Sequence, residues 1–223
     1  MSKKSIAKFE NVIFSDEDIT IGPFSLSINE GDICHLLSSS DAYAATFLRG
    51  LATIIKAEGD FYFQDKFFDL NDYRKLLEIK RKVAYLGPHC GLMSNRSLKD
   101  NIFLFSVWEK NLTKPKEDEK FYSDCIKAGI KDSLNLRPSK VSEEVKCGTY
   151  IIKEFKKEPE LILIERPYLF TRGRLDLLLR EKTEKLLMKK IPLVVFTNIN
   201  FLPYHKATHT ISIEDNLVEK IER

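Results

Sequence analysis

A polar loop at residues 38–43 is well placed for chemistry, because it joins a short apolar strand at residues 33–37 to a helix at residues 44–55. A loop in this place binds phosphate when it reads Gly-x-x-x-x-Gly-Lys-Ser/Thr. The glycines let backbone amides curl around the phosphates, and the lysine neutralises them. Here residues 38–46 read Ser-Ser-Ser-Asp-Ala-Tyr-Ala-Ala-Thr, and the whole sequence contains no Gly-Lys dipeptide. The ordinary phosphate-binding loop is therefore missing.

Cysteine is the other residue type that brings chemistry of its own, and the sequence contains Cys34, Cys90, Cys125 and Cys147. These residues are widely separated, form no Cys-x-x-Cys pair and have no histidine at metal-binding spacing. The pattern favours buried or free thiols over a zinc site, so we expect no metal.

Composition limits the classes of partner and the compartment. The chain has 223 residues, of which 43% are apolar and 31% charged, and its net charge is +3 from 36 basic and 33 acidic residues. This balance gives no electrostatic case for nucleic acid, so we expect no nucleic-acid partner. The N-terminal residues lack the apolar stretch of a secretory signal, and no run reaches the roughly 20 apolar residues of a membrane-spanning helix. We therefore expect a cytoplasmic protein.

Apolar periodicity predicts strands and helices in alternation along the chain. Strands are expected at residues 9–14, 19–28, 33–37, 60–64, 82–86, 161–164 and 193–197, and helices at 44–55, 142–157 and 174–190. A helical, charged middle is expected from about residue 98 to 130, and a hairpin at 208–213 and 217–221. This order indicates a mostly parallel α/β sheet with an antiparallel part at the N-terminus. Residues 1–223 are expected to form a single unit with a helical subdomain inserted at residues 92–138.

The order of several segments resembles that of the nucleotide-binding domains of ABC transporters. Residues 11–14 and 24–32 are similar to the family's approach to the phosphate loop, and residues 98–102 to the start of the helix after the Q-loop. Residues 138–142 stand where the family has its signature segment. Residues 158–167 are similar to the "eP.lLllDEPt" strand, and residues 213–218 to the closing hairpin. The resemblance covers essentially the whole chain. It implies a P-loop NTPase-like ABC ATPase fold and a dimer of such domains.

The phosphate-loop positions depart from the family pattern at Ser38, Asp41, Tyr43, Ala44, Ala45 and Thr46. Ala44 stands at the lysine position, Asp41 would place a carboxylate among the phosphates, and Tyr43 would fill space that a glycine leaves for them. Thr46 could offer its hydroxyl to Mg²⁺, but a threonine in a first helical turn is more often a cap or simply packed.

The other positions that the resemblance assigns to nucleotide chemistry are also altered. Asp16 falls near the adenine-stacking aromatic, Pro88 at the Q-loop glutamine, Glu165 at the metal-linked aspartate, Arg166 at the glutamate that activates water, and Asn198 at the histidine. A cation cannot act as a general base near neutral pH. We expect Arg166 to pair with a local carboxylate instead.

The signature position reads Ser142, Glu143 and Glu144 within residues 141–145, so carboxylates replace both glycines. In the family this segment meets the γ-phosphate held by the other subunit, and like charges at such range would cost several kcal/mol in a poorly solvated interface. The resemblance therefore implies that neither composite site formed with this chain hydrolyses ATP in the usual way.

Three functions remain open on these grounds. The leading hypothesis is a non-hydrolysing docking or scaffolding subunit of a membrane permease, paired with a second ABC-type subunit as a homo- or heterodimer and bound at the cytoplasmic face of the inner membrane. It needs no cofactor. Candidate contacts with the permease are Leu92, Met93, Phe103, Phe105 and Trp108, although Phe103 also fits a buried helical face.

The second hypothesis is an ATPase subunit with unusual motifs, which would bind ATP and Mg²⁺ and take positive charge from Lys140 or Lys146. The third is a regulatory or dimerising protein without a transporter.

Overall fold

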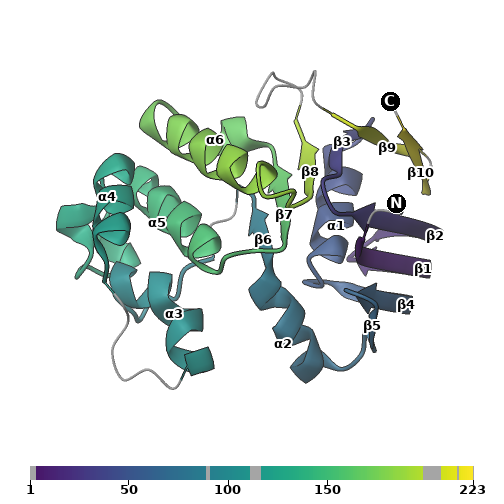
Figure 1. Ribbon diagram of the computed structural model, residues 1–223, viewed down its shortest axis with the longest axis horizontal. Helices are drawn as coiled ribbons and strands as arrows, with labels where there is room; N and C mark the ends of the chain where they lie inside the picture. Colours follow the sequence, from purple (N-terminus) through teal and green to yellow (C-terminus); the bar gives the residue numbers. More distant parts are fainter. Residues whose placement is uncertain (1–3, 89–90, 111–116, 198–206, 215, 223) are drawn as a thin grey trace.

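The computed structural model describes residues 4–88, 91–110, 117–197, 207–214 and 216–222, with the side chains of residues 105–110 outside the description. Its strands form two sheets that lie close to one another (Figure 1). The four-stranded sheet has the order β2 (Ile19–Asn29), β1 (Ser5–Asp16), β4 (Lys56–Phe63) and β5 (Lys66–Phe68), and all its pairs are antiparallel.

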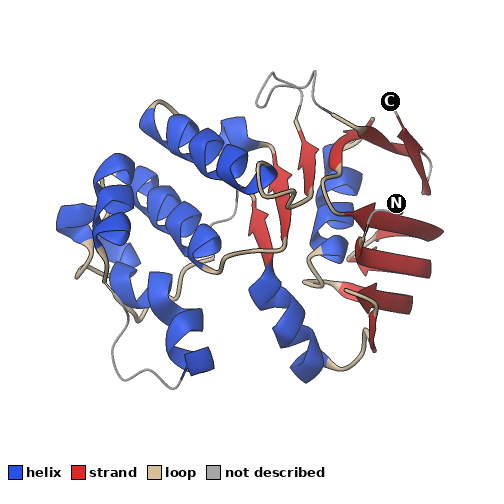
Figure 2. Cartoon of the chain, viewed as in Figure 1, coloured by secondary structure: helices blue, strands red, loops and turns tan. Residues whose placement is uncertain are grey.

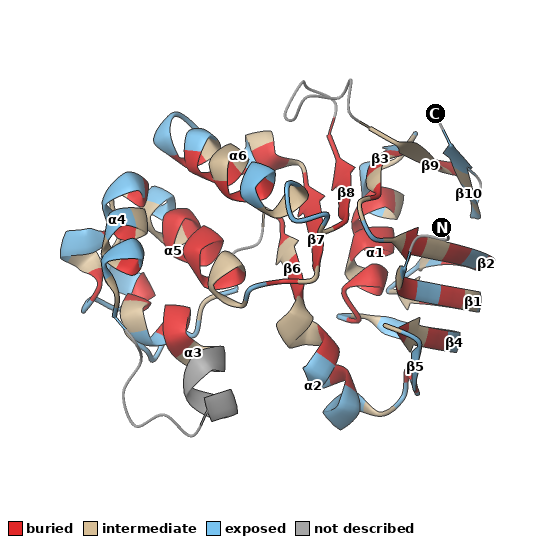
Figure 3. Cartoon of the chain, in the orientation of Figure 1, coloured by how far each residue is buried: buried red, intermediate tan, exposed pale blue. Residues whose placement is uncertain are grey.

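The six-stranded sheet is mostly parallel. Its order is β10 (Leu217–Glu222), β9 (His209–Glu214), β3 (Ile33–Ser38), β8 (Leu193–Phe196), β7 (Leu161–Glu165) and β6 (Val83–Leu86). Only the β9–β10 pair at one edge is antiparallel among its described pairs. Every residue of β7 is buried, as expected of a central parallel strand covered on both faces (Figure 3).

Helix α1 (Asp41–Leu51) lies between the two sheets and contacts β1 and β2 on one side and β3 and β7 on the other. Its buried face contains Phe47, Leu48 and Leu51, which join a core of aromatic residues from the antiparallel sheet. Phe14 packs edge-on against Phe9 and Phe24 and also meets Phe47. The mixed α/β architecture with an N-terminal antiparallel sheet confirms the predicted fold class.

The other helices gather mainly on the opposite side of the parallel sheet from the antiparallel strands (Figure 2). They are α2 (Tyr73–Lys82), α3 (Leu98–Lys110), α4 (Glu119–Ala128), α5 (Glu143–Lys156) and α6 (Arg174–Leu187), with 3₁₀ turns at Lys131–Ser133, Pro138–Lys140 and Pro167–Leu169. Helices α3 to α6 pack with β6, β7 and β8 in a second apolar core. Residues 92–138 contain α3 and α4, and their role as an inserted subdomain stays a prediction.

Several predicted elements need correction. Helix α1 runs from Asp41 to Leu51 instead of 44–55; its first residues, Asp41 to Tyr43, are exposed or half-buried and so lack the apolar pattern on which the prediction relied. The predicted helical region at 98–130 contains two helices, α3 and α4. Helix α2 and strand β5 were not predicted. Helix α2 carries a strongly charged sequence with only Leu76 and Ile79 buried, so its apolar periodicity is weak, although Asp72 caps it by accepting hydrogen bonds from Arg74 N and Lys75 N.

In the described ranges, no helix is both long enough and apolar enough to cross a membrane.

Gly50 allows α1 to approach the antiparallel sheet, because a Cβ atom at this position would lie 2.3 Å from Phe14 Cδ2. We expect Gly50→Ala to lower the free energy of unfolding by about 1–2 kcal/mol, since the clash exceeds the gain of about 1 kcal/mol in helix propensity. Urea denaturation measures the change. The same substitution made together with Phe14→Ala should cost less, because the clashing ring atoms are gone; an equal cost in both backgrounds would contradict the packing account.

Candidate functional site

The connection between β3 and α1 is short and is held by hydrogen bonds within the turn. Strand β3 ends at Ser38, and α1 begins at Asp41 with Ser40 as its N-cap residue. Ser38 Oγ donates to Ser40 O at 3.0 Å and accepts from Ser40 N at 3.2 Å, which closes the turn on itself. Ala44 N already donates to Ser40 O at 3.1 Å within the first helical turn. The amides of Ser40 and Ala44 are therefore engaged within the turn itself.

Arg166 links the end of β7 to the start of α1. Its Nη1 lies 3.0 Å from Asp41 Oδ2, and its Nη2 lies 2.6 Å from Glu165 Oε1. The side chain of Glu165 is 3% exposed and that of Arg166 18%, whereas Asp41 is largely in solvent. The expected pairing of Arg166 with a local carboxylate is therefore confirmed by two contacts, and the pair with Asp41 covers the N-terminus of α1.

The second oxygen of Glu165, Oε2, accepts a hydrogen bond from the hydroxyl of Tyr85 on β6. Burial, and then the charge and hydrogen bond of Glu165, raise the pKa of the Tyr85 phenol well above its usual value, so Tyr85 stays a donor at neutral pH. Both carboxylate oxygens of Glu165 thus have partners. Sequence reasoning missed Tyr85, although a tyrosine in the otherwise apolar strand Val83–Leu86 was the available signal.

The Arg166 backbone adopts a left-handed conformation, with φ 44° and ψ 59°. Non-glycine residues pay about 1–2 kcal/mol for this region. The conformation is held by the hydrogen bond from Arg166 N to Phe196 O at 2.8 Å, which ties the end of β7 to β8. Burial opposes the Arg166 charge, but the hydrogen bonds and negative charges of Glu165 and Asp41 raise its pKa above the usual value. Arg166 is a fixed cation in this site.

The remaining phosphate-loop positions face the core. Ala44, Ala45 and Thr46 are buried, and Thr46 Oγ1 finds no hydrogen-bond partner in the part of the chain that the structure describes. Asp16, expected near an adenine ring, pairs with Arg49 of α1 at 2.7 Å. Tyr43, in the first turn of α1, is half-buried and packs against the core.

The predicted signature residues form the start of α5. Ser142 is the N-cap residue and accepts a hydrogen bond from Val145 N at 3.4 Å. Glu143 pairs with Lys146 at 2.5 Å, and Glu144 pairs with Arg174 of α6 at 2.9 Å. Carboxylates in a first helical turn interact favourably with the helix dipole. At the N-terminus of α5, Glu143 and Glu144 therefore supply the negative charge that a bound anion would otherwise supply.

The Q-loop and histidine positions are only partly described. Pro88 is half-exposed and follows Gly87, where a Cβ atom would lie 3.3 Å from Glu165 Oε2, so the chain passes close to the Glu165 carboxylate here. Asn198 lies outside the described residues.

The predicted permease contacts divide into three groups. Phe103 is a correction, because its side chain is 1% exposed and its ring lies 4.8 Å from that of Phe121 in the helical core. Leu92 is partly buried against the same core, and Met93 is 42% exposed. The side chains of Phe105 and Trp108 lie outside the described part of the chain.

Arg166→Met should lower the free energy of unfolding by about 3 kcal/mol, because it leaves the buried Glu165 carboxylate without its cation. Arg174→Met is the matched control: it breaks the ion pair with Glu144, in which both side chains are about half exposed, and should cost under about 1 kcal/mol. Urea denaturation of both variants compares them. Equal losses of unfolding free energy in the two variants would mean that the Arg166–Glu165 pair stabilises the fold no more than an exposed ion pair does.

Known proteins were compared with the chain by sequence. No protein-family model matches it. A probable amino-acid ABC transporter ATP-binding protein of Haemophilus influenzae is 26% identical over 146 residues, which are 63% of this chain and 57% of that protein. The methionine import ATP-binding protein MetN 2 of Pseudomonas entomophila is 23% identical over 149 residues, which are 65% of this chain and 44% of that protein. The chain spans about half the length of these relatives.

Solved structures match over nearly the whole chain. The dimeric post-hydrolysis state of the ATP-binding cassette MJ0796, bound to ADP and Pi, superimposes with a TM-score of 0.77 at 18% identity and covers 97% of this chain and 98% of that one. The cbiO1 protein of Clostridium perfringens, part of the ABC transporter complex cbiONQ, gives a TM-score of 0.68 at 14% identity and covers 97% and 88%. In fold the chain is an ATP-binding cassette, and in sequence it is similar to ATP-binding proteins of ABC transporters.

Proposed function

We propose that this chain is a non-hydrolysing subunit of an ABC-type complex, which uses the cassette fold to dock on a membrane permease at the cytoplasmic face of the membrane. The observation that carries the proposal is the bridge from Arg166 to both Asp41 and Glu165. It places a fixed cation and its two carboxylate partners at the end of β7 and the start of α1, where the family resemblance assigns phosphates and the residues that act on them.

The first supporting step concerns phosphate binding. A helix N-terminus binds anions through backbone amides that have no other partner. At α1 the turn closes through Ser38 and Ser40, Ala44 takes the place of a lysine, and Asp41 adds its own negative charge. A nucleotide phosphate would have to approach a carboxylate without a glycine-lined cradle or a lysine to offset the repulsion.

The second step concerns hydrolysis. A general base needs an acceptor atom within hydrogen-bond reach of the attacking water. Arg166 is a cation with a raised pKa, and Glu165 is buried with its oxygens engaged by Arg166 and Tyr85. Breaking these contacts to recruit Glu165 would leave a buried charge unpaired, which costs several kcal/mol.

The third step concerns the face that would meet another subunit. The first turn of α5 presents Glu143 and Glu144 to solvent. Such a surface would repel a γ-phosphate held by a partner cassette. The chain would therefore contribute to a dimer through its fold rather than by completing an ATP site. The partner cassette is a second copy or a different ABC-type subunit.

The docking role follows from the properties of similar proteins. MJ0796 forms a dimer, and cbiO1 is part of a transporter complex. In this chain the exposed Met93 and the partly buried Leu92 lie between β6 and α3, the region that the resemblance assigns to the permease. An ATPase subunit with unusual motifs is the alternative. Of the two lysines that could supply its positive charge, Lys140 and Lys146, the second is paired with Glu143 at 2.5 Å.

Calorimetric titration of the purified chain with Mg-ATP should give no binding heat, and millimolar nucleotide should not raise the melting temperature. A ligand at about 100 times its dissociation constant would stabilise the fold by about 2.7 kcal/mol, so even modest binding is detectable. Ala44→Lys alone should also fail to bind, because the loop backbone and Asp41 are unchanged. Saturable binding of Mg-ATP by the natural chain would support the ATPase alternative. Binding of Mg-ATP by the Ala44→Lys variant would contradict the claim that the whole loop, and not the missing lysine alone, prevents binding.

The docking role is tested with the tagged chain as bait: detergent-solubilised membranes of its own organism are mixed with it, and the proteins that it retains are identified. An integral membrane protein should be recovered, and Met93→Asp should weaken its recovery at least about tenfold, because a buried charge opposes an apolar contact. Met188→Asp is the matched control, since Met188 is 77% exposed at the far end of α6. If no membrane protein is recovered, the result favours a regulatory protein without a transporter.

A further inference from the structure

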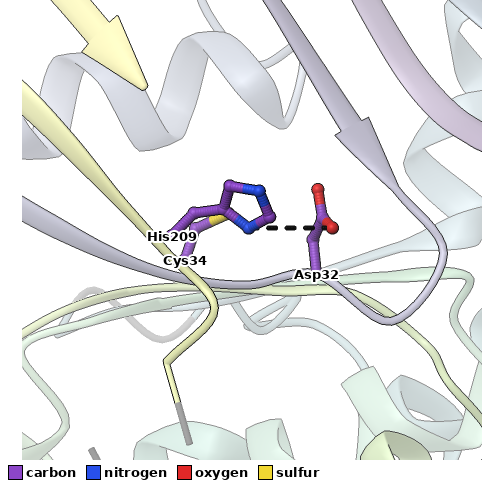
Figure 4. Close-up of side chains that lie close together, drawn as sticks. All are labelled: Asp32, Cys34 and His209. Atoms are coloured by element: carbon purple, nitrogen blue, oxygen red, sulfur yellow. Dashed lines mark ion pairs between the residues drawn. The ribbon is translucent and has the colours of Figure 1, made fainter. Parts of the chain in front are cut away.

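Three side chains of metal-ligand type meet at the β3–β9 pairing. Asp32 and Cys34 lie two residues apart and so face the same side of the chain, and Cys34 pairs in register with His209 on β9. One ligand atom from each of Asp32, Cys34 and His209 lies within 4.8 Å of the other two (Figure 4). Ligands of a tetrahedral zinc ion stand about 3.5 Å apart, so small side-chain rotations would bring the three to bonding distance.

The Asp32 carboxylate is already oriented for binding through one oxygen. Its Oδ2 lies 2.6 Å from Lys220 Nζ and accepts a hydrogen bond from Asn29 N at 3.0 Å. The other oxygen, Oδ1, faces His209 Nδ1 at 3.7 Å. Metal-binding carboxylates are commonly held by outer hydrogen bonds of this kind, which fix their orientation.

The His209 ring can give up its contact with Thr208 and turn toward a metal ion while Thr208 keeps its other hydrogen bonds. His209 Nδ1 lies 2.7 Å from Thr208 Oγ1, but this hydroxyl also lies 3.3 Å from Ile33 O and accepts from Ile33 N. The Thr208 proton therefore has a second acceptor when Nδ1 turns to a metal ion. Lys220 additionally donates to Ser27 O at 2.6 Å, so it holds β10 against β2 in either state.

Solvent reaches this cluster from one side. A cavity of about 390 Å³ lies between β2, β9 and β10, with His209 and Lys220 on its wall together with Ser27, Asn29 and Glu222. Asp32 and Cys34 are fully buried behind it. A metal ion could therefore enter past His209 and keep a water molecule as its fourth ligand.

We propose that Asp32, Cys34 and His209 form a zinc-binding site. A thiolate with an imidazole favours Zn²⁺ over Mg²⁺ or Ca²⁺, which prefer oxygen ligands. Binding replaces the Cys34 thiol proton with the metal ion, and the proton passes to solvent. The site lies at the start of β3, whereas Arg166 directly follows the parallel strand β7, so the two lie at opposite ends of the parallel strands and the proposal does not depend on nucleotide binding. Without a metal, Lys220 serves as the structural counter-charge of Asp32.

Cobalt(II) is the probe for the test, because a thiolate ligand gives it a charge-transfer absorption band and tetrahedral geometry gives intense visible bands. The metal-free, untagged full chain is titrated with Co²⁺ under reducing, oxygen-free conditions, and then with Zn²⁺. We expect both sets of bands to appear and Zn²⁺ to abolish them. If the natural chain gives only the weak spectrum of hydrated cobalt, the zinc proposal is wrong and the cluster is a structural ion pair.

Variants then assign the ligands. Cys34→Ser should remove the charge-transfer band, and His209→Gln should weaken Co²⁺ binding at least about tenfold. Cys147→Ser and His35→Gln are matched controls, because Cys147 belongs to the helical core and His35 faces Thr197 instead, and both should bind as the natural chain does. If Cys34→Ser does not fold, His209→Gln decides the outcome. A full-strength band in Cys34→Ser, or unchanged affinity in His209→Gln, would overturn the assignment.

Discussion

The position of α1 between the two sheets is the constraint on which the rest of the site depends. Gly50 lets the helix lie directly against Phe14 of β1, while the other side of α1 meets the strands of the parallel sheet. Because both sides are packed, neither the axis nor the first turn of α1 can shift without opening the aromatic core. This packing places Asp41 within reach of Arg166, 125 residues later in the sequence.

The Arg166 network satisfies a buried carboxylate at the end of β7. A buried carboxylate such as Glu165 is costly unless it is paired and hydrogen-bonded. Arg166 and Tyr85 meet that need, and the left-handed backbone at Arg166 costs less than leaving Glu165 unpaired would. The proposal of a non-hydrolysing subunit rests on these contacts.

The two ends of the parallel strands carry different chemistry. At the ends of the parallel strands the charges of Glu165, Arg166 and Asp41 close on one another. At the start of β3, Asp32 is paired with Lys220 but also faces His209, beside a cavity that opens to solvent. The proposed docking and metal-binding roles therefore rest on separate parts of the molecule.

Local sequence determined most of the fold. The apolar run at β7, the alternation of strands and helices and the missing glycines and lysine of the phosphate loop could all be read directly, because they depend on neighbouring residues. Helix α2 was not predicted from the sequence, because only two of its residues are buried and its apolar periodicity is weak. Only the tertiary structure decided that Arg166 pairs with Asp41, that Tyr85 joins Glu165, that Phe103 is buried, and that Cys34 meets His209, 175 positions away. Such contacts are set by strand register and helix packing, which bring distant residues together and leave no periodic signal in the sequence.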